Sequence, residues 1–213
     1  MSKPLILIGG GGHASVLTDI ILSQGQNILA VISPCEIESR SVFAGIRHIK
    51  EEREISEFSP EEVLCVNAIG MLPNSEQRKT IANRYRSLGY RFASVIAKSA
   101  QISQFSFLDD GVQVLQGAVI QAGAVIGAGS IVNTGAVIDH DSVLGALNHI
   151  ASGARICGGV TLEDEVFVGA GATITQSVNI GRGAVVGAGA IVNKNIVSYG
   201  TIYPPKPFLR VKE

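Results

Sequence analysis

The chain of 213 residues contains no tryptophan, and aromatic residues make up only 5% of it. Large aromatic rings usually supply much of the buried area of a domain core. Their scarcity indicates that a large part of this core is too narrow to hold them and is built from smaller aliphatic side chains. Such side chains are abundant, because hydrophobic residues as a whole account for 46% of the chain.

Cysteine and an excess of charge of one sign are also lacking. Cys35, Cys65 and Cys157 are odd in number and do not have the spacing of a metal site, so we expect buried thiols and no bound metal. The 17 basic and 18 acidic residues give a net charge of −1, and therefore no electrostatic reason to expect nucleic acid or an anionic membrane as a partner.

Long apolar runs are absent as well. Apolar residues come in twos and threes, broken by Gly, Gln, Asn and Thr, and no run approaches the length of a membrane-spanning helix. The apolar stretch within residues 1–8 is too short for a signal peptide. We therefore expect no membrane insertion and a cytoplasmic location.

What the sequence does contain is a six-residue repeat between Ser94 and Asn195. From Ile96 to Val192 every sixth residue is Ile, Leu or Val, in 17 consecutive units, and glycine follows three residues later in 10 of them. A period of six fits short strands separated by tight turns, with glycine supplying a positive φ. Three units then close one coil, and coils stacked about 4.8 Å apart form a β-solenoid prism of about six coils.

Ahead of the repeat, the pattern alternates between strands and helices. We expect strands over residues 4–9, 28–32 and 62–66, and helices after the first glycine run, over 51–58 and over 75–88. This alternation predicts a small parallel α/β sheet of the Rossmann-like kind, ending near Gly89. The last helix is expected to carry four basic residues on its polar side: Arg78, Lys79, Arg84 and Arg86.

The glycine run after the first strand matches a phosphate-binding fingerprint. Gly9, Gly11 and Ala14 fit the pattern G-x-G-x-x-G/A between a strand and a helix, where backbone N–H groups meet a pyrophosphate. The alternative is a tight turn with no ligand. His13 lies at the start of the helix, where a ring N–H would add a donor to the ligand, although capping or packing is an equally open explanation.

The repeat is broken at one informative place, the segment VIDHD. Five successive units carry glycine at the turn, from Gly111 to Gly135, and the sixth carries Asp141, preceded by His140. Departures from a local rule concentrate at functional sites. The phase of the repeat places His140 on an outward turn, and we interpret it as catalytic rather than as an ordinary exposed residue.

The coil length decides which residues lie near His140. Eighteen residues later comes Gly158, which leaves space and a backbone N–H beside the imidazole. His149 adjoins an inward-facing residue and therefore faces outward. A second row with the same spacing, Ser152, Ala170 and Ala188, is small throughout and forms a smooth edge for an extended ligand.

Together the two halves resemble the NeuD/PglD-type sugar acyltransferases, and most of all the VioB-type nucleotide-amino-sugar N-acetyltransferases. The resemblance rests on GGGGHASV, the AIG closing the third strand, VIDHD, NHIASGARICGG and the Pro/Lys tail, and it covers nearly the whole chain. It implies a left-handed β-helix and a homotrimer with active sites between neighbouring prisms. The implied domains are a nucleotide-sugar-binding domain (1–89), the β-helix (90–198) and an extended C-terminal tail (199–213).

The resemblance also assigns roles to residues. It implies His140 as general base and Asp141 as the acid that orients it. Contacts to acetyl-CoA, including its pantetheine arm, are implied for His149, Gly158, Ala170 and Ala188. Contacts to the nucleotide sugar are implied for Gly11, Gly12, His13, Ser33 and Gly70. In the tail, Lys206 or Arg210 would meet cofactor phosphates, unless the tail is merely solvated.

Two departures from the family pattern affect this assignment. Many relatives have Glu where this chain has Asp141, and an acidic pair after the second strand where it has Ser33 and Pro34. An acid at that place commonly accepts a hydrogen bond from a ribose 2′-hydroxyl. Its absence favours a deoxyribonucleotide, so we expect a dTDP-linked substrate.

The function implied is acetyl-CoA-dependent N-acetylation of a nucleotide-linked 4-amino-4,6-dideoxy sugar, for a surface polysaccharide such as O-antigen. No metal is needed for this chemistry. One alternative is O-acetylation of a sialic acid or another sugar by the same machinery. Another is a non-catalytic trimeric scaffold, against which the His140–Asp141 break in the glycine series counts.

Overall fold

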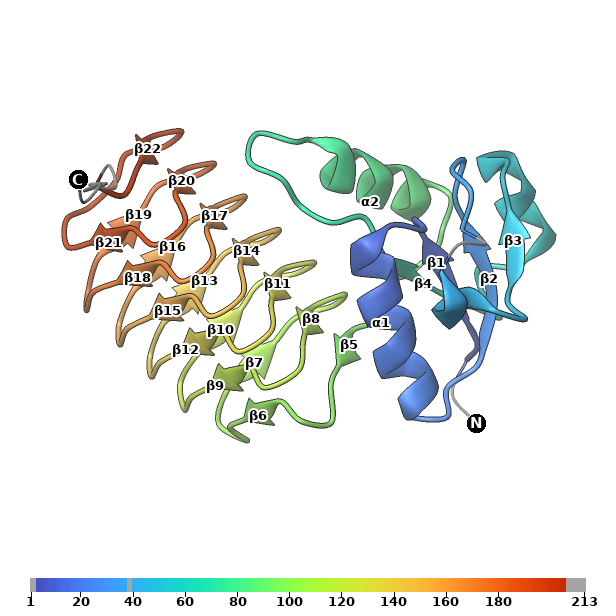
Figure 1. Cartoon of the computed structure of the whole chain (residues 1–213), viewed down its shortest axis with the longest axis horizontal. Helices are drawn as coiled ribbons and strands as arrows, with labels where there is room; N and C mark the ends of the chain where they lie inside the picture. Colours follow the sequence, from blue (N-terminus) through green and yellow to red (C-terminus); the bar gives the residue numbers. More distant parts are fainter. Residues whose placement is uncertain (1–2, 38–39, 206–213) are drawn as a thin grey trace, which may run out of the picture.

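The computed structural model describes residues 3–37 and 40–205. It consists of an N-terminal α/β domain and a three-sided prism of stacked coils that lie side by side (Figure 1). The predicted fold class, a small parallel α/β domain followed by a left-handed parallel β-helix, is confirmed. Lys206 and Arg210 lie outside the described residues.

The N-terminal domain is built on a four-stranded sheet in the order β3-β2-β1-β4, with every pair parallel. The central strand β1 is buried along its whole length, which explains its uninterrupted apolar sequence LILI. The elements are β1 (Leu5–Ile8), α1 (Gly12–Ser23), β2 (Ile28–Ile32), η1 (Ser41–Phe43), β3 (Arg47–Ile49), η2 (Glu52–Glu57), β4 (Leu64–Asn67) and α2 (Gln77–Ser87).

Several local expectations for this domain are corrected. Strand β3 was not predicted, because in its sequence RHI only Ile49 is buried and three residues carry no periodic signal. The helix expected over 51–58 is a 3-10 helix, η2. Arg78, expected on the polar side of α2, is buried, with only 3% of its surface exposed. Cys35, expected to be a buried thiol, is exposed, whereas Cys65 is buried.

The order of the strands brings two loops together at one edge of the sheet. Strand β1 lies between β2 and β4, so the chain leaves β1 toward one side and later crosses back to the other. Ligands of open α/β sheets bind where the strand order reverses, beyond the carboxyl ends of the strands. At that point the glycine turn after β1 faces the segment Asn67–Gly70 after β4, and Gly70 lies against His13.

The β-helix has three parallel sheets, which we call faces I, II and III. Paired residues are 18 positions apart in sequence, as Val95 and Gln113 show, so each coil takes three six-residue units. Face I contains β5 (Val95–Ile96), β8 (Gln113–Val114), β11 (Ile131–Val132), β14 (His149–Ile150), β17 (Phe167–Val168), β20 (Val185–Val186) and β22 (Thr201–Ile202). Face II contains β6 (Gln101–Ile102), β9 (Val119–Ile120), β12 (Val137–Ile138), β15 (Arg155–Ile156), β18 (Thr173–Ile174) and β21 (Ile191–Val192). Face III contains β7 (Phe107–Leu108), β10 (Val125–Ile126), β13 (Val143–Leu144), β16 (Thr161–Leu162) and β19 (Asn179–Ile180).

The inside of the prism is filled as the repeat predicts. Aliphatic residues of the series and the small residues two places earlier form one buried cluster, running from Val112 to Val192. Ile96, the first of the series, is 39% exposed because no earlier coil covers it. Glycines at the turns take positive φ, and so does Asp141, with a φ of 57°.

The end of the prism differs from the expectation that the chain leaves the pattern at Tyr199. Thr201 and Ile202 form a further strand, β22, which pairs with β20 on face I. The offset there is 16 residues, from Val186 to Ile202, so the final coil is two residues shorter than the others.

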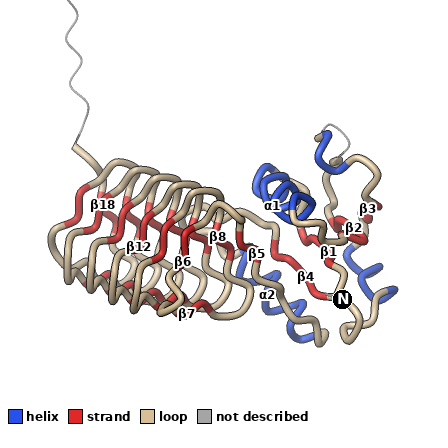
Figure 2. The backbone as a smooth tube through the Cα atoms, turned by 90° about the horizontal axis from the view of Figure 1, so that it is seen from below, coloured by secondary structure: helices blue, strands red, loops and turns tan. Residues whose placement is uncertain are grey.

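The two parts of the chain share a common core where they meet. Val95, Ala97 and Leu115 of the β-helix belong to the same buried apolar cluster as β1 and α1. Figure 2 shows the α/β domain seated at the β5 and β8 end of the stack. None of the helices among the described residues is long and apolar enough to cross a membrane.

Candidate active site

His140 and Asp141 stand on the turn between β12 of face II and β13 of face III. His140 Nδ1 lies 2.8 Å from Asp141 Oδ2. A carboxylate oxygen accepts and does not donate, so Nδ1 carries the hydrogen and Nε2 keeps a free lone pair. The imidazole is 64% exposed and Asp141 is 73% exposed, so the pair faces out of the prism, as the repeat predicts.

The carboxylates beside His140 change its affinity for a proton. The Asp141 hydrogen bond, followed by the charge of Asp139, raises the pKa of the His140 imidazole above its ordinary value. Asp139 also accepts a hydrogen bond from the His140 backbone N–H through Oδ1, at 2.8 Å. A neutral imidazole with an oriented Nδ1–H and a raised pKa is suited to accept a proton at Nε2.

Gly158, one coil beyond His140 on the same edge, is required by the imidazole. A Cβ added to Gly158 would come within 2.5 Å of His140 Nε2 and 2.7 Å of Cε1. The ring therefore lies over the glycine, and any side chain there would displace it. Among the described residues, no acceptor is bonded to the Gly158 backbone N–H, so this donor is unused on the coil that the imidazole covers.

The other residues expected to contact the cofactor lie elsewhere on the same prism. Ala170 and Ala188 are exposed on the edge between faces I and II, together with Ser152, one coil apart as predicted. His140 and Gly158 occupy the edge between faces II and III. Within one chain, the structure does not bring these two sets of residues together.

His149 points out of the prism from face I but is covered by other residues. It is only 7% exposed, and its ring packs on Phe167 with the centroids 5.1 Å apart. Its Nε2 lies 3.5 Å from Asn133 Nδ2, and its Nδ1 is buried without a partner among the described residues. Burial, and then the charges of His13 and Arg78, lower the pKa of His149 to about 4, so the ring is neutral.

The four glycines after β1 have different roles. Gly9 has a φ of 113°, and a Cβ there would lie 2.8 Å from Ile69. A Cβ on Gly10 would lie 2.3 Å from Ile37. Gly11 and Gly12, in contrast, face open space at the start of α1. The first two glycines thus allow close packing, and the last two leave backbone N–H groups of the helix N-terminus accessible to an anion.

His13, in the first turn of α1, is held by the β-helix. Its Nε2 lies 2.7 Å from Oε1 of Gln113, on β8. Burial lowers the pKa of His13 to about 4, the Gln113 hydrogen bond opposes this, and the charge of Arg78 adds to it. Ser33, at the end of β2, is buried, and its hydroxyl bonds to Cys35 within the same turn at 3.2 Å.

No motif or repeat in the sequence indicates the polar residues that lie between the two domains. Gln113 is fully buried, and its Nε2 donates to the Asn67 carbonyl at 2.8 Å. Arg78 donates to the carbonyls of Asn67 and Ile69, and across the interface to that of Gly129. A glutamine on a strand and an arginine on a helix are ordinary surface residues in sequence, so only the docking of the two domains reveals them.

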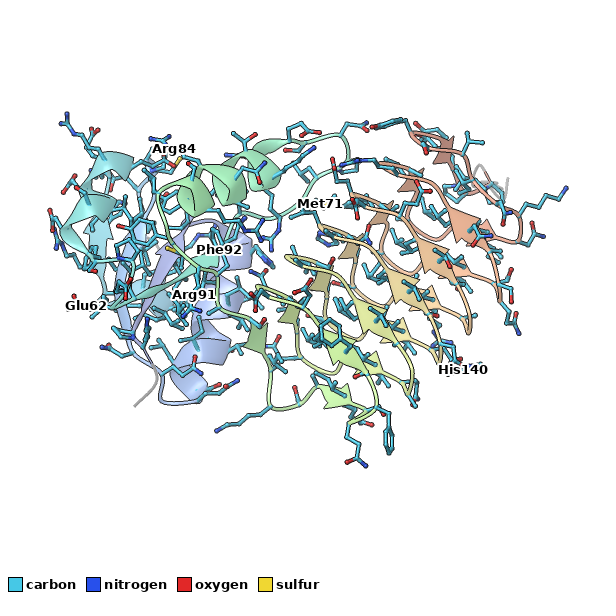
Figure 3. The ribbon with its side chains drawn as sticks, turned by 180° about the vertical axis from the view of Figure 1, so that it is seen from behind. Glu62, Met71, Arg84, Arg91, Phe92 and His140 are labelled. Carbon is cyan, nitrogen blue, oxygen red and sulfur yellow. The ribbon has the colours of Figure 1, made fainter. Side chains whose placement is uncertain are left out.

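Figure 3 shows His140 on the prism well away from the N-terminal domain. The general-base candidate and the glycine turn of the same chain therefore do not face each other. No group of three metal-ligating side chains occurs among the residues that the structure describes.

A β-helix of hexapeptide repeats with an exposed, carboxylate-oriented histidine defines an acyltransferase. Family models agree: the PglD N-terminal domain matches residues 4–85, and the hexapeptide repeat of succinyl-transferase matches residues 152–194. The chain belongs to the NeuD/PglD-type sugar acyltransferase family, because it aligns over nearly its whole length with a solved member at 30% identity.

That member is the acetyltransferase domain of PglB from Neisseria gonorrhoeae, in complex with acetyl coenzyme A. It has a TM-score of 0.85, and the match covers 98% of this chain and 100% of that one. A histidine variant of perosamine N-acetyltransferase from Caulobacter crescentus, in complex with CoA and GDP-perosamine, matches at 29% identity, with a TM-score of 0.84 over 94% of this chain and 93% of that one. WeeI from Acinetobacter baumannii, at 22% identity, a TM-score of 0.80 and 94% and 96% coverage, shares the fold.

Proposed function

We propose that this protein transfers an acetyl group from acetyl-CoA to the amino group of a nucleotide-linked 4-amino-4,6-dideoxy sugar. The observation that carries the proposal is the His140–Asp141 pair, which lies over Gly158 with Nε2 free. The complexes of perosamine N-acetyltransferase with CoA and GDP-perosamine, and of the PglB domain with acetyl coenzyme A, support the substrate classes. Surface-polysaccharide synthesis in the cytoplasm is part of this proposal.

His140 acts as the general base. The amine lone pair attacks the thioester carbonyl carbon, a C–N bond forms, and the carbonyl oxygen becomes an oxyanion that the Gly158 N–H stabilises. His140 Nε2 takes the proton from the ammonium nitrogen, while Asp141 stabilises the imidazolium through Nδ1–H. The C–S bond then breaks, the amide remains on the sugar, and the CoA thiolate leaves with the proton from His140.

The acetyl-CoA arm lies along the edge that carries Ala170 and Ala188, where small side chains leave the backbone accessible. Because His140 is on another edge, the site is completed by a neighbouring chain, and we propose a homotrimer in which edges of adjacent prisms meet. Refolding mixtures of a His140→Ala chain with an Ala188→Trp chain tests this. Activity should return in mixed trimers, and well-folded mixed trimers without activity would refute the shared site.

The sugar nucleotide binds at the switch point of the α/β sheet, with its diphosphate on the N–H groups of Gly11 and Gly12 and its sugar toward His13 and Gly70. We propose thymidine as the base, since no carboxylate stands at Ser33 or Pro34 to accept a ribose 2′-hydroxyl. Calorimetry with thymidine, uridine and guanosine diphosphates decides this, and tighter binding of a ribonucleotide would reject it.

The acetylation itself is tested with acetyl-CoA and nucleotide-linked 4-amino sugars, by mass spectrometry of the product. We expect the sugar to gain one acetyl group on nitrogen, while the matched 4-hydroxy sugar stays unmodified. Acetylation of the hydroxyl compound in preference to the amine would replace N-acetylation by O-acetylation. Loss of the reaction in the His140→Ala variant links it to this site.

A further inference from the structure

A chain of buried and partly buried hydrogen bonds connects the glycine turn to the β-helix. From Gly129 of the prism it passes through the Arg78 guanidinium to the Asn67 carbonyl, then through the Gln113 amide to His13. Arg78, Asn67 and Gln113 are 3%, 6% and 0% exposed. Water therefore does not compete for the two bonds to the Asn67 carbonyl, and their directions are determined by the protein alone.

The direction of each bond follows from what each group can donate. The Asn67 carbonyl only accepts, so the Gln113 amide nitrogen must point to it, at 2.8 Å. This turns the Gln113 amide oxygen toward His13. Since that oxygen also only accepts, His13 Nε2 must carry the hydrogen. In a neutral imidazole the other nitrogen, Nδ1, then holds a lone pair.

The surroundings of His13 keep the ring neutral. Arg78 is buried against three backbone carbonyls, and no carboxylate is bonded to it among the described residues. Burial lowers the pKa of Arg78 to about 9, so it still carries its charge at neutral pH and opposes a second positive charge on His13.

The second ring nitrogen of His13 has no protein partner among the described residues and is not fully sealed from solvent. His13 Nδ1 has no partner among the described residues, yet it is not a buried, unpartnered atom of the kind found in Thr18, Tyr85 and His149. A lone pair repels a phosphate oxygen and attracts a hydroxyl or amine hydrogen. The anionic part of a ligand would instead bind to the accessible backbone N–H groups at Gly11 and Gly12.

We propose that Gln113 is a positioning residue for substrate recognition: it fixes the His13 ring so that Nδ1 accepts a hydrogen bond from a hydroxyl or amino group on the sugar. This deepens the proposed function and rests on it. The sugar is the relevant part because His13 lies at the contact with β8, on the β-helix side of the glycine turn. The His13 ring accepts a hydrogen bond from a donor group on the sugar, and the diphosphate binds to the backbone at Gly11 and Gly12.

The first test needs no substrate. The chain has four histidines, so nitrogen NMR of histidine-labelled protein is simple to assign, with a His13→Asn variant identifying the His13 signals. At neutral pH we expect a neutral ring with its hydrogen on Nε2, and a mixture of tautomers in Gln113→Met, which keeps the side-chain volume but removes both hydrogen bonds. A hydrogen on Nδ1, or a charged ring, in the wild-type protein would overturn the proposal.

The second test measures binding by calorimetry. Gln113→Met should weaken binding of the nucleotide-linked amino sugar about tenfold, the size expected for one hydrogen bond to a fixed group. Binding of the nucleoside diphosphate alone, and the KM for acetyl-CoA, should not change. Gln101→Met, at an exposed strand position of face II, is the matched control and should change nothing.

Two further variants keep the test valid if Gln113→Met is poorly folded. The Asn amide in His13→Asn reaches the Nδ1 position and the Gln amide in His13→Gln reaches the Nε2 position, so the Asn variant should keep more of the sugar's affinity. Equal losses for the nucleoside diphosphate and the sugar nucleotide, or better binding by the Gln variant, would refute the role of His13. If the wild-type protein acetylates the sugar but Gln113→Met binds the sugar nucleotide as well as the wild type does, the proposed function stands and the role of Gln113 is refuted. If Gln113→Met weakens binding as expected but the wild-type protein does not acetylate the sugar, the proposed function is refuted and the role of Gln113 in binding stands.

Discussion

Three of the four histidines occupy two opposite environments, and the difference separates a ring suited to change its charge from rings that stay neutral. His140 is exposed beside two carboxylates, which raise its pKa. His13, which is half-buried, and His149, which is buried, are both affected by the charge of Arg78, and their pKa falls to about 4. A ring that must take up a proton during a reaction needs the first environment. A ring that must offer a fixed hydrogen-bonding pattern needs the second.

The largest effect is expected at the exposed edge. His140→Ala removes the proton acceptor and should lower kcat about 10²-fold or more, the usual scale of general base catalysis. The KM for acetyl-CoA should stay within a few-fold, because the proposed path of the acetyl-CoA arm follows another edge of the prism. Steady-state kinetics with both substrates measures this. Full activity in the His140→Ala variant would show that the exposed histidine is not the proton acceptor.

The two histidines with a lowered pKa, His13 and His149, should make the folded state sensitive to acid. His13 and His149 are neutral when folded and bind protons when unfolded, so their contribution to stability is complete above pH 6.5 and is lost as the pH falls toward 4. At pH 5 the loss should reach about 2 kcal/mol for each ring. Urea unfolding at pH 7 and pH 5 measures it.

A matched pair of variants sharpens the test. His149→Leu should remove about half of this acid-dependent loss, whereas His140→Ala should leave it in place, because the exposed ring does not become neutral on folding. An equal acid-dependent loss in wild type and in His149→Leu would show that water reaches the buried ring.

The smallest effect is expected from the partner of His140. Asp141→Asn removes the main cause of the raised pKa, so the His140 pKa should fall and the acidic limb of the kcat/KM profile should move to lower pH. The rate at neutral pH should fall less than in His140→Ala. Asp139→Asn, which removes only the second cause, is the control and should shift the limb less. An unchanged acidic limb in Asp141→Asn would show that Asp141 is only a turn residue.

The β-helix could be predicted closely from sequence, because each coil repeats the same local rule and the rule fixes what points inward. The same phase indicated that His140 faces out and that Gly158 lies beside it. It also placed His149 outside the prism, but it gave no sign of the residues that cover that ring. The ring packs on Phe167 with Asn133 beside its Nε2, and the charges of His13 and Arg78, from the docked N-terminal domain, act on it.

The α/β domain was less predictable, because its parts depend on contacts between distant segments. Three residues sufficed for β3 only because Ala30, Val31 and Ile32 of β2 provide an edge for them. In sequence, Arg78 has the pattern of an ordinary helix-surface residue, and only the docked prism brings the carbonyl of Gly129 against it. Local patterns thus revealed the glycine turn, but not the hydrogen bonds that orient His13.

The offset of 18 residues between paired strands around His140 also means that the position of the base along the prism can change only in whole coils. Removing or duplicating one whole coil between Gln113 and His140 would preserve every register and every inward residue, but would move the base along the prism axis by one inter-strand step of about 4.8 Å. Smaller insertions would rotate it to another face. The distance along the prism axis between the base and the nucleotide-binding domain of the same chain can therefore change only in whole inter-strand steps.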